Sequence, residues 1–265
     1  MSRIADRKRE LELLQQMLQG RSPFRVLLLE APSERGKTVL LAEFAACVDE
    51  LLGPGLCARL DFKGGLTLDE LFSRLCHDLN AVGFATYTAQ GPSCVVNVKA
   101  DLKDAQFRDH NEVTVQPVIH TGALELTYVR GAALIEDLRT WSKPVMVILD
   151  TFESATEEAM HWVLQHLLPA VHTIRHLYVV IAGQRVPDAR QHLLQWGHLA
   201  RNHLLPTVTS IDDWYELASS RHPGFPRHYI ETVCLGLLER PSAIETYIET
   251  VARNLPSPEN PFSET

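Results

Sequence analysis

A strand, a short loop and a helix that follow one another near the start of the chain constrain its fold more than any other feature. Residues 24–29 form a mostly apolar run, which is typical of a strand buried on both faces. Residues 38–52 are strongly apolar and predict a helix that the Gly-Pro-Gly stretch at 53–55 ends. The loop between them consists of Ala31, Pro32, Ser33, Glu34, Arg35, Gly36, Lys37 and Thr38.

The residues of this loop suit a bound phosphate. Backbone N–H groups of a tight loop, together with the dipole of the following helix, attract an anion. In the pattern G-x-x-x-x-G-K-[ST] the lysine reaches the outer phosphates and the hydroxyl binds Mg²⁺. We therefore predict that residues 31–39, ending at Val39, bind a nucleotide, that Lys37 holds its β- and γ-phosphates, and that Thr38 ligates Mg²⁺.

One position of the loop departs from that pattern. Ala31 stands where the first glycine is usual. Alanine fills this position if its backbone φ is negative. The alternative interpretation is an ordinary strand–turn–helix in which Lys37 is a solvated surface residue.

A second buried strand, predicted over residues 145–149, ends in Asp150. Ligands of open α/β sheets bind at the carboxyl ends of the strands. Phosphate-loop sites also take an acidic Mg²⁺ residue from a neighbouring strand. Asp150 is therefore the predicted second metal residue, and the alternative is that it only caps the next turn.

Two residues are predicted to act on the attacking water or the γ-phosphate. Thr151 follows Asp150 directly, so Glu153 is the nearest acid that can polarise a water molecule. The alternative is that Glu153 only places a charge at the start of a helix. Hydrolysis would then be slow or absent. Arg185 follows the apolar run 177–182 and is predicted to sense the γ-phosphate. The alternative is a surface arginine paired with Asp188.

Strand and helix patterns alternate along most of the chain. Strands are predicted near 24–29, 56–62, 145–149, 177–182 and 204–208, and helices near 6–19, 38–52, 68–79, 125–141, 155–168 and 188–196. Asp6 is a candidate cap for the first helix. Such alternation predicts βαβ units, hence a three-layer α/β sandwich around a mostly parallel five-stranded sheet.

Composition shifts mark the predicted domains. Residues 84–122 contain more Gly, Ser, Thr and Asn than the segments around them, together with short apolar alternations. This composition predicts a β-rich insertion. This insertion is either a docking surface or a passive surface arm. Helical patterns cover 211–255 and predict a small helical lid. Residues 256–265 are predicted to form a flexible tail. The core is therefore predicted over 1–210.

Bulk properties restrict the class of protein. With 33 acidic and 25 basic residues the net charge is -8, which disfavours nucleic acid as a partner except at a local basic patch. No apolar run is long enough to cross a bilayer. The five cysteines are scattered without a C-x-x-C pair, so we expect a reduced, cytoplasmic protein without a zinc or disulfide framework.

These features together resemble the STAND branch of the P-loop ATPases, which is related to the AAA+ group. Residues 4–11 are similar to the opening φ-φ-Gly-Arg-x-x-Glu-Leu segment of that family, with Asp6 in place of glycine. The resemblance implies that Ile4 and Arg7 contact the adenine. Residues 150–153 are similar to its Walker B ending, and residues 182–185 to its sensor segment.

The lid resembles that family more loosely. Residues 236–243 are similar to the Gly-x-Pro segment that approaches the nucleotide, although Glu239 replaces the glycine. Pro241 matches that segment, and the resemblance implies that Pro241 contacts the nucleotide.

The resemblance implies an ATP-controlled regulatory switch of bacterial signalling or defence. Such a switch binds ATP and Mg²⁺, forms homo-oligomers in the ATP state and drives a separate effector or sensor protein. We expect Mg²⁺-dependent ATP hydrolysis, and the missing guanine-reading N-K-x-D segment favours ATP over GTP. Two alternatives stay open: an AAA+-like motor or loader working on DNA, and a non-hydrolysing nucleotide-binding scaffold.

Overall fold

Five parallel strands form the central sheet of the computed structural model, which describes residues 4–79, 84, 86–87, 123–208, 210–237 and 240–255. The strands lie in the order β2-β3-β4-β1-β5, and each adjacent pair is parallel. They are β1 (Val26–Glu30), β2 (Cys57–Asp61), β3 (Val145–Asp150), β4 (Leu177–Gly183) and β5 (Ala200–Leu204). The predicted mostly parallel five-stranded sheet is therefore confirmed.

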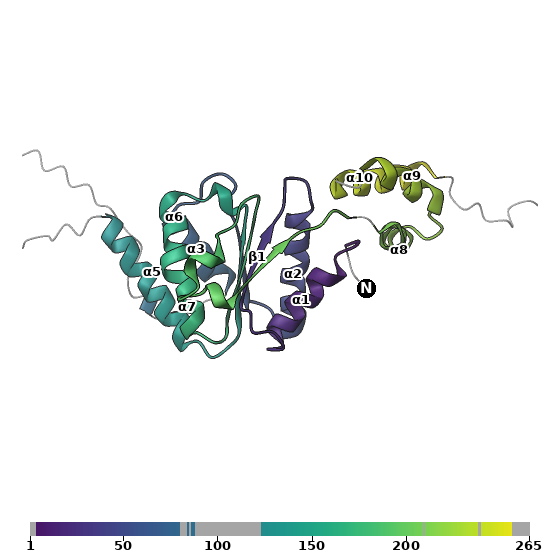
Figure 1. Ribbon diagram of the computed structural model, residues 1–265. Coiled ribbons are helices and arrows are strands. Elements are labelled where there is room, and N and C mark those ends of the chain that lie inside the picture. Colours follow the sequence, from purple (N-terminus) through teal and green to yellow (C-terminus); the bar gives the residue numbers. More distant parts are fainter. Residues whose placement is uncertain are drawn as a thin grey trace, which may run out of the picture.

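Helices cover both faces of this sheet (Figure 1). One face carries α1 (Lys8–Leu18) and α2 (Lys37–Leu52). The other face carries α3 (Leu68–Asp78), α5 (Ala123–Thr140), and the run of α6 (Glu157–Trp162), a π-turn (Val163–Leu167) and α7 (Leu168–Thr173).

The two apolar layers follow from the alternation of side chains along each strand. In β1, Leu27 and Leu29 pack into the cluster that contains Leu40 and Phe44 of α2. Val26 and Leu28 point the other way, into the cluster on the α3 side of the sheet. Burial on both faces explains why β1 is apolar at consecutive positions.

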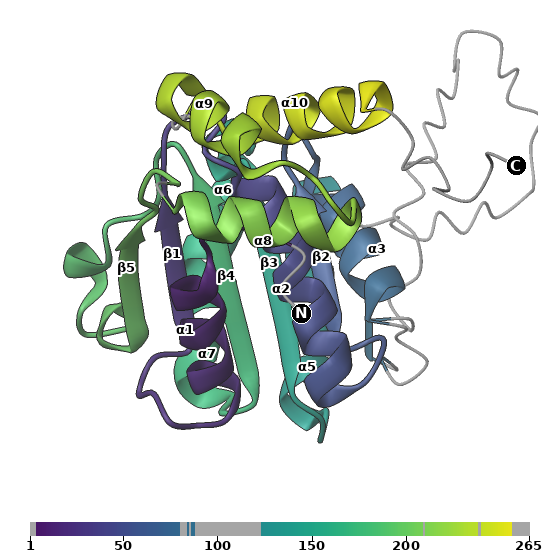
Figure 2. The same ribbon diagram turned by 90° about the vertical axis from the view of Figure 1, so that its right-hand side faces the viewer.

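Three helices form a unit with an apolar core of its own. They are α8 (Ile211–Arg221), α9 (Arg227–Leu237) and α10 (Pro241–Asn254). Trp214, Phe225, Ile230 and Ile244 are buried between them. Figure 2 shows these helices lying across the end of the sheet, above the arrowhead of β1. The helical unit therefore lies over the carboxyl ends of the strands.

The structure corrects three local predictions. The fifth strand covers Ala200–Leu204 rather than 204–208, since the edge strand is polar and Pro206 has no N–H to donate. The helix predicted near 188–196 is replaced by the short 3₁₀ turns Ala189–His192 and Gly197–Leu199, which pack so closely that a Cβ at Gly197 would lie 2.0 Å from the carbonyl of Ala189. Asp6 does not cap α1: its carboxylate accepts the backbone N–H of Ser210 at 3.1 Å.

Two predicted segments fall outside the described residues. The tail at 256–265 is one, and most of the β-rich insertion at 84–122 is the other. Of that insertion, Phe84 packs on Trp141, and the N–H groups of Thr86 and Tyr87 donate to Asp137. Among the helices of the described ranges, none has the length and apolar character required to span a membrane.

Candidate nucleotide-binding site

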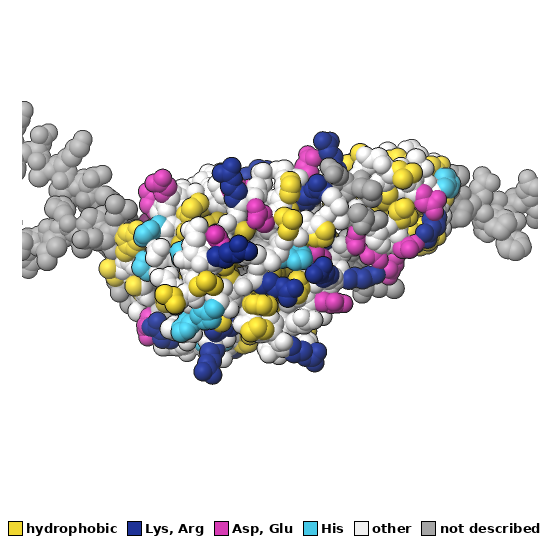
Figure 3. Space-filling view, viewed as in Figure 1, with side chains coloured by type: hydrophobic (Ala, Val, Ile, Leu, Met, Phe, Trp, Pro, Cys, Tyr) yellow, Lys and Arg dark blue, Asp and Glu magenta, His cyan; other side chains and the backbone are white. Residues whose placement is uncertain are grey.

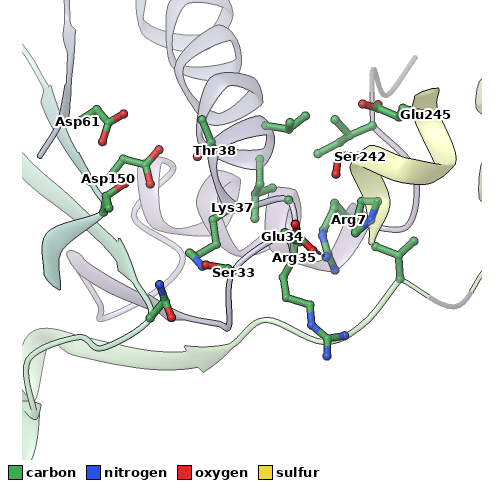
Figure 4. A pocket seen from close by; sticks show the side chains of 18 of the residues that line it. Arg7, Ser33, Glu34, Arg35, Lys37, Thr38, Asp61, Asp150, Ser242 and Glu245 are labelled. Carbon is green, nitrogen blue, oxygen red and sulfur yellow. Dashed lines mark hydrogen bonds between the residues drawn. The ribbon is translucent and has the colours of Figure 1, made fainter. Parts of the chain in front are cut away.

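A cavity of about 670 Å³ lies at the carboxyl end of the sheet, between the strands and the helical unit. Figure 4 shows its side chains converging from the loop after β1, from the ends of β2 and β3, and from the helical unit. It brings together most of the residues that the sequence predicts to bind a nucleotide: Ile4, Arg7, Ser33, Glu34, Arg35, Gly36, Lys37, Thr38, Val39, Asp150, Glu153 and Pro241.

The loop after β1 has the backbone that a phosphate cradle requires. Gly36 has φ 78° and immediately precedes α2, while Glu34 has φ 64°. Left-handed conformations of this kind allow successive N–H groups to face one concavity. Ala31 is buried, has no positive φ, and donates its N–H to the carbonyl of Gly183 at 3.1 Å. Alanine therefore fits the first position of the loop.

The ammonium group of Lys37 lies within this loop. Its Nζ donates to the carbonyls of Ala31 and Pro32, both at 2.7 Å. Burial lowers the pKa of Lys37 from its ordinary value, whereas the carboxylates of Glu153 and Asp150 oppose that shift. Because an ammonium has three donors, a further N–H is available to a phosphate in the cavity.

Asp150 is a buried acid at the end of β3 and only 1% exposed. Its Oδ2 has no hydrogen-bond partner among the described residues, and the closest cationic group is the guanidinium of Arg59 at 3.7 Å. A buried carboxylate oxygen without a hydrogen bond is destabilising unless a cation meets it. Carboxylate and hydroxyl oxygens suit Mg²⁺, so Asp150 and Thr38, which line the same cavity, fit this ion.

Glu153 lies in the short 3₁₀ turn Phe152–Ser154 and lines the cavity. The preceding Thr151 has φ 56°, a conformation that β-branched residues rarely adopt. The Oε2 atom of Glu153 accepts the backbone N–H of Gln184 at 3.0 Å. The carboxylate is therefore fixed beside the end of β4, at the same edge of the sheet as residues 31–38, which we call the phosphate loop.

Arg185 is not brought to the cavity. Its side chain is exposed in the turn after β4 and does not line the cavity. The alternative partner Asp188 instead accepts the backbone N–H of Arg190 at 3.0 Å. Arg185 therefore lies outside the cavity in this structure.

The helical unit and the N-terminal segment contact the phosphate loop directly. The Arg240 Nε atom lies 3.2 Å from the Glu34 carboxylate, and a side-chain carbon at Gly36 would meet Pro241 at 3.6 Å. Arg7, only 3% exposed, donates to the carbonyls of Arg35 at 3.0 Å and Pro206 at 3.1 Å. Arg7 therefore joins the phosphate loop to the segment that leads into α8, and it also lines the cavity.

Several cavity residues are absent from the sequence-based prediction: Asp61, Lys63, Gln184, Val208, Trp214, Ser242 and Glu245. Asp61 carries a signal that could have found it, since it lies at the carboxyl end of the strand predicted over 56–62, as Asp150 does for the strand predicted over 145–149. Trp214 and Glu245 carry none, because their position depends on how the helical unit packs over the sheet.

Comparison with known proteins agrees with this architecture. No family model matches the chain. The HTH-type transcriptional regulator MalT of Yersinia enterocolitica is 23% identical over 195 residues, covering 70% of this chain and 18% of that regulator. The chain thus spans less than a fifth of the length of this relative.

Solved structures match over nearly the whole chain. The Walker-type ATPase of Pyrococcus abyssi is 16% identical with a TM-score of 0.53, covering 95% of this chain and 69% of that one. Cdc6p of Pyrobaculum aerophilum is 12% identical with a TM-score of 0.56, covering 96% and 64%. The ORC2 protein of Aeropyrum pernix is 14% identical with a TM-score of 0.55, covering 95% and 69%. The chain therefore has the α/β fold of the P-loop ATPases.

Proposed function

We propose that this chain is an ATP-binding, Mg²⁺-dependent ATPase of the STAND type, which acts as a nucleotide-controlled switch. One observation carries the proposal: Lys37, from the loop after β1, and Asp150 and Glu153, from the end of β3, converge on a cavity that the helical unit also lines. Cavities of a few hundred Å³ with a few convergent polar groups are typical of ligand sites.

Each polar residue has a distinct role in this proposal. The N–H groups of residues 33–38 and the ammonium of Lys37 bind the phosphates. Thr38 and Asp150 hold Mg²⁺, which would neutralise charge on the phosphate oxygens. Glu153, held by the N–H of Gln184, orients the attacking water and accepts its proton.

The apolar lining of the cavity suits a purine base. This lining includes Ile4, Val39, Val208 and Trp214, and Val39 is 44% exposed although it is apolar. An adenine ring in this place would cover the exposed apolar surface of Val39.

Contacts between the phosphate loop and the helical unit support the switch. A nucleotide in the cavity would contact Lys37 of the core and Pro241 of the helical unit at the same time. A ligand shifts a conformational equilibrium by its differential affinity for the two states. ATP and ADP differ at the γ-phosphate, next to the loop that Arg240 and Pro241 touch, so they would favour different positions of the unit. The resemblance to a transcriptional regulator also favours a regulatory role.

A DNA-associated ATPase is the second candidate, because the fold is shared with ORC and Cdc6 proteins. The net charge of -8 argues against it. On the face drawn in Figure 3, Lys and Arg side chains are dispersed among apolar and uncharged ones over the core, and acidic side chains gather beside the helical unit. Binding of duplex DNA that falls steeply with added salt would favour this candidate over the switch.

The molar mass in solution tests the switch. We expect light scattering to show a larger assembly with a non-hydrolysable ATP analogue than with ADP. We also expect ATP turnover that Lys37→Ala and Glu153→Gln both abolish, while Glu153→Gln still binds ATP. The same mass with both nucleotides would rule out the switch. Binding without turnover in the unsubstituted chain would identify a nucleotide-binding scaffold instead.

A further inference from the structure

Asp61 and Asp150 end two neighbouring parallel strands in the same register. Asp61 is the partner of Asp150 in the β2–β3 pair, as Arg59 is of Ile148. Adjacent strands lie about 4.8 Å apart, and residues in register project to the same face of a sheet. Two carboxylates therefore project side by side from this edge.

The shared face is the one that α2 covers. In β2, Ala58 and Leu60 belong to the cluster on the opposite side of the sheet, so Arg59 and Asp61 face α2. The Arg59 guanidinium confirms this direction, since it donates to the carbonyl of Thr38 at 3.0 Å. In Figure 4 the carboxylates of Asp61 and Asp150 both lie on the side that faces Thr38.

Two cations, Arg59 and Lys37, act on this pair, yet one oxygen of Asp150 lacks a hydrogen bond among the described residues. Asp150 is 1% exposed and its Oδ2 has no hydrogen-bond partner among the described residues. Arg59 lies 3.7 Å from that oxygen. Asp61 accepts the N–H of Lys63 at 2.9 Å through Oδ1, which orients its carboxylate, and both acids line the cavity. Like charges side by side are destabilising unless a cation lies between or beside them.

We propose that Asp61 is the second acidic residue of the divalent-cation site, together with Asp150 and Thr38. This inference rests on the proposed nucleotide-binding function. Thr151 follows Asp150 in the chain, so the acid beside Asp150 comes from the adjacent strand and not from the next position. Oxygen ligands from carboxylates and a hydroxyl are those that Mg²⁺ takes.

The Mg²⁺ dependence of nucleotide binding tests this assignment. Binding of a non-hydrolysable ATP analogue is measured by calorimetry on the full chain, as Mg²⁺ is raised from an EDTA-treated start. Asp61→Asn keeps the side-chain oxygen that Lys63 N–H requires but removes the charge. We expect it to raise the half-maximal Mg²⁺ concentration roughly 10-fold, as is typical when a residue supporting a metal site is changed.

Three variants sharpen the result. Asp150→Asn should raise the half-maximal Mg²⁺ concentration further. Asp61→Glu keeps the charge, so its half-maximal Mg²⁺ concentration should be close to that of the unsubstituted chain. Asp49→Asn, at an exposed position near the end of α2, should leave it unchanged. In EDTA, Asp61→Asn should bind the analogue at least as well as the unsubstituted chain, since a negative charge near the phosphates is gone.

Two outcomes would overturn the inference and are distinguishable. If Asp61→Asn matches Asp49→Asn while Asp150→Asn raises the Mg²⁺ requirement, Asp61 does not serve the metal and the proposed function stands. If the unsubstituted chain binds no nucleotide at any Mg²⁺ concentration, the proposed function fails, and the inference with it.

Discussion

The Glu153 carboxylate lies against Gly183, in the place that a side chain at residue 183 would occupy. A Cβ built on Gly183 would lie 2.4 Å from Oε2 of Glu153 and 2.7 Å from the carbonyl of Arg185. The same oxygen accepts the N–H of Gln184 at 3.0 Å. The end of β4 therefore fixes the direction of the carboxylate that the proposed mechanism uses to orient water.

Gly183→Ala should displace Glu153 and lower ATP turnover, while ATP binding through Lys37 persists. Overpacking of this kind also destabilises the fold, by about 1–3 kcal/mol. Steady-state hydrolysis, calorimetric ATP binding and urea unfolding measure the three effects.

The matched control is Gly236→Ala, since a Cβ at Gly236 meets nothing within 4 Å. Because Gly236 lies in α9, alanine should stabilise the chain by roughly 0.5–1 kcal/mol and leave turnover unchanged. Full turnover in Gly183→Ala would show that the position of Glu153 is unimportant.

Arg7→Lys should loosen the phosphate loop. The guanidinium of Arg7 reaches the carbonyls of Arg35 and Pro206 together, and a lysine ammonium does not reproduce that fork. Leaving a buried carbonyl unpaired costs about 1–3 kcal/mol, so urea unfolding should show a loss in that range with weaker ATP binding. Arg9→Lys, at an exposed position of α1, should shift stability by less than about 0.5 kcal/mol. Equal effects of the two changes would contradict this role of Arg7.

Much of the fold could be predicted because β1, β3 and β4 are apolar at consecutive positions and end at turn residues. In a parallel sheet their carboxyl ends meet at one edge, which is why the loop at 31–38 and Asp150 were both predicted there. The edge strand β5 was misplaced because it contains Arg201, Asn202 and His203. Its polar sequence carries no apolar alternation, and its place in the sheet is seen only from its pairing with β1.

Contacts between distant segments could not be predicted from local patterns. The buried Nε2 atom of His203 in β5 forms a hydrogen bond of 2.8 Å with Oε1 of Glu10 in α1, 193 residues away in the chain. Trp214 lies at the cavity only because the helical unit packs over the sheet. Arg185 follows a buried strand as a sensor residue would, yet the turn after β4 directs its side chain to solvent. Such outcomes depend on tertiary packing.

Glu10→Gln should remove an acid-sensitive part of the stability. Burial opposes ionisation of Glu10, but the hydrogen bond with His203, a backbone hydrogen bond and the charge of Arg7 outweigh it, and the pKa of Glu10 is lowered below 4.5. A lowered pKa contributes stability that is present above the unfolded-state value and is lost as the pH falls through the folded-state value.

We therefore expect Glu10→Gln to destabilise the chain by about 1–3 kcal/mol at neutral pH, with a difference that shrinks below pH 4.5. Urea unfolding across the acidic range measures this. Glu12→Gln, at an exposed position of the same helix, is the control. A constant difference between Glu10→Gln and the unsubstituted chain at every pH would argue against this contribution.

The most direct test of the nucleotide site is calorimetric binding of ATP, in the presence of Mg²⁺, to the unsubstituted chain and to Lys37→Ala and Lys143→Ala. Lys143 is exposed in the loop before β3, at the opposite end of the sheet. We expect the unsubstituted chain and Lys143→Ala to bind ATP equally, and Lys37→Ala to bind roughly 10- to 100-fold more weakly, as the loss of a hydrogen bond to a charged group implies. Equal binding by Lys37→Ala, or no ATP binding by the unsubstituted chain, would contradict the site described here.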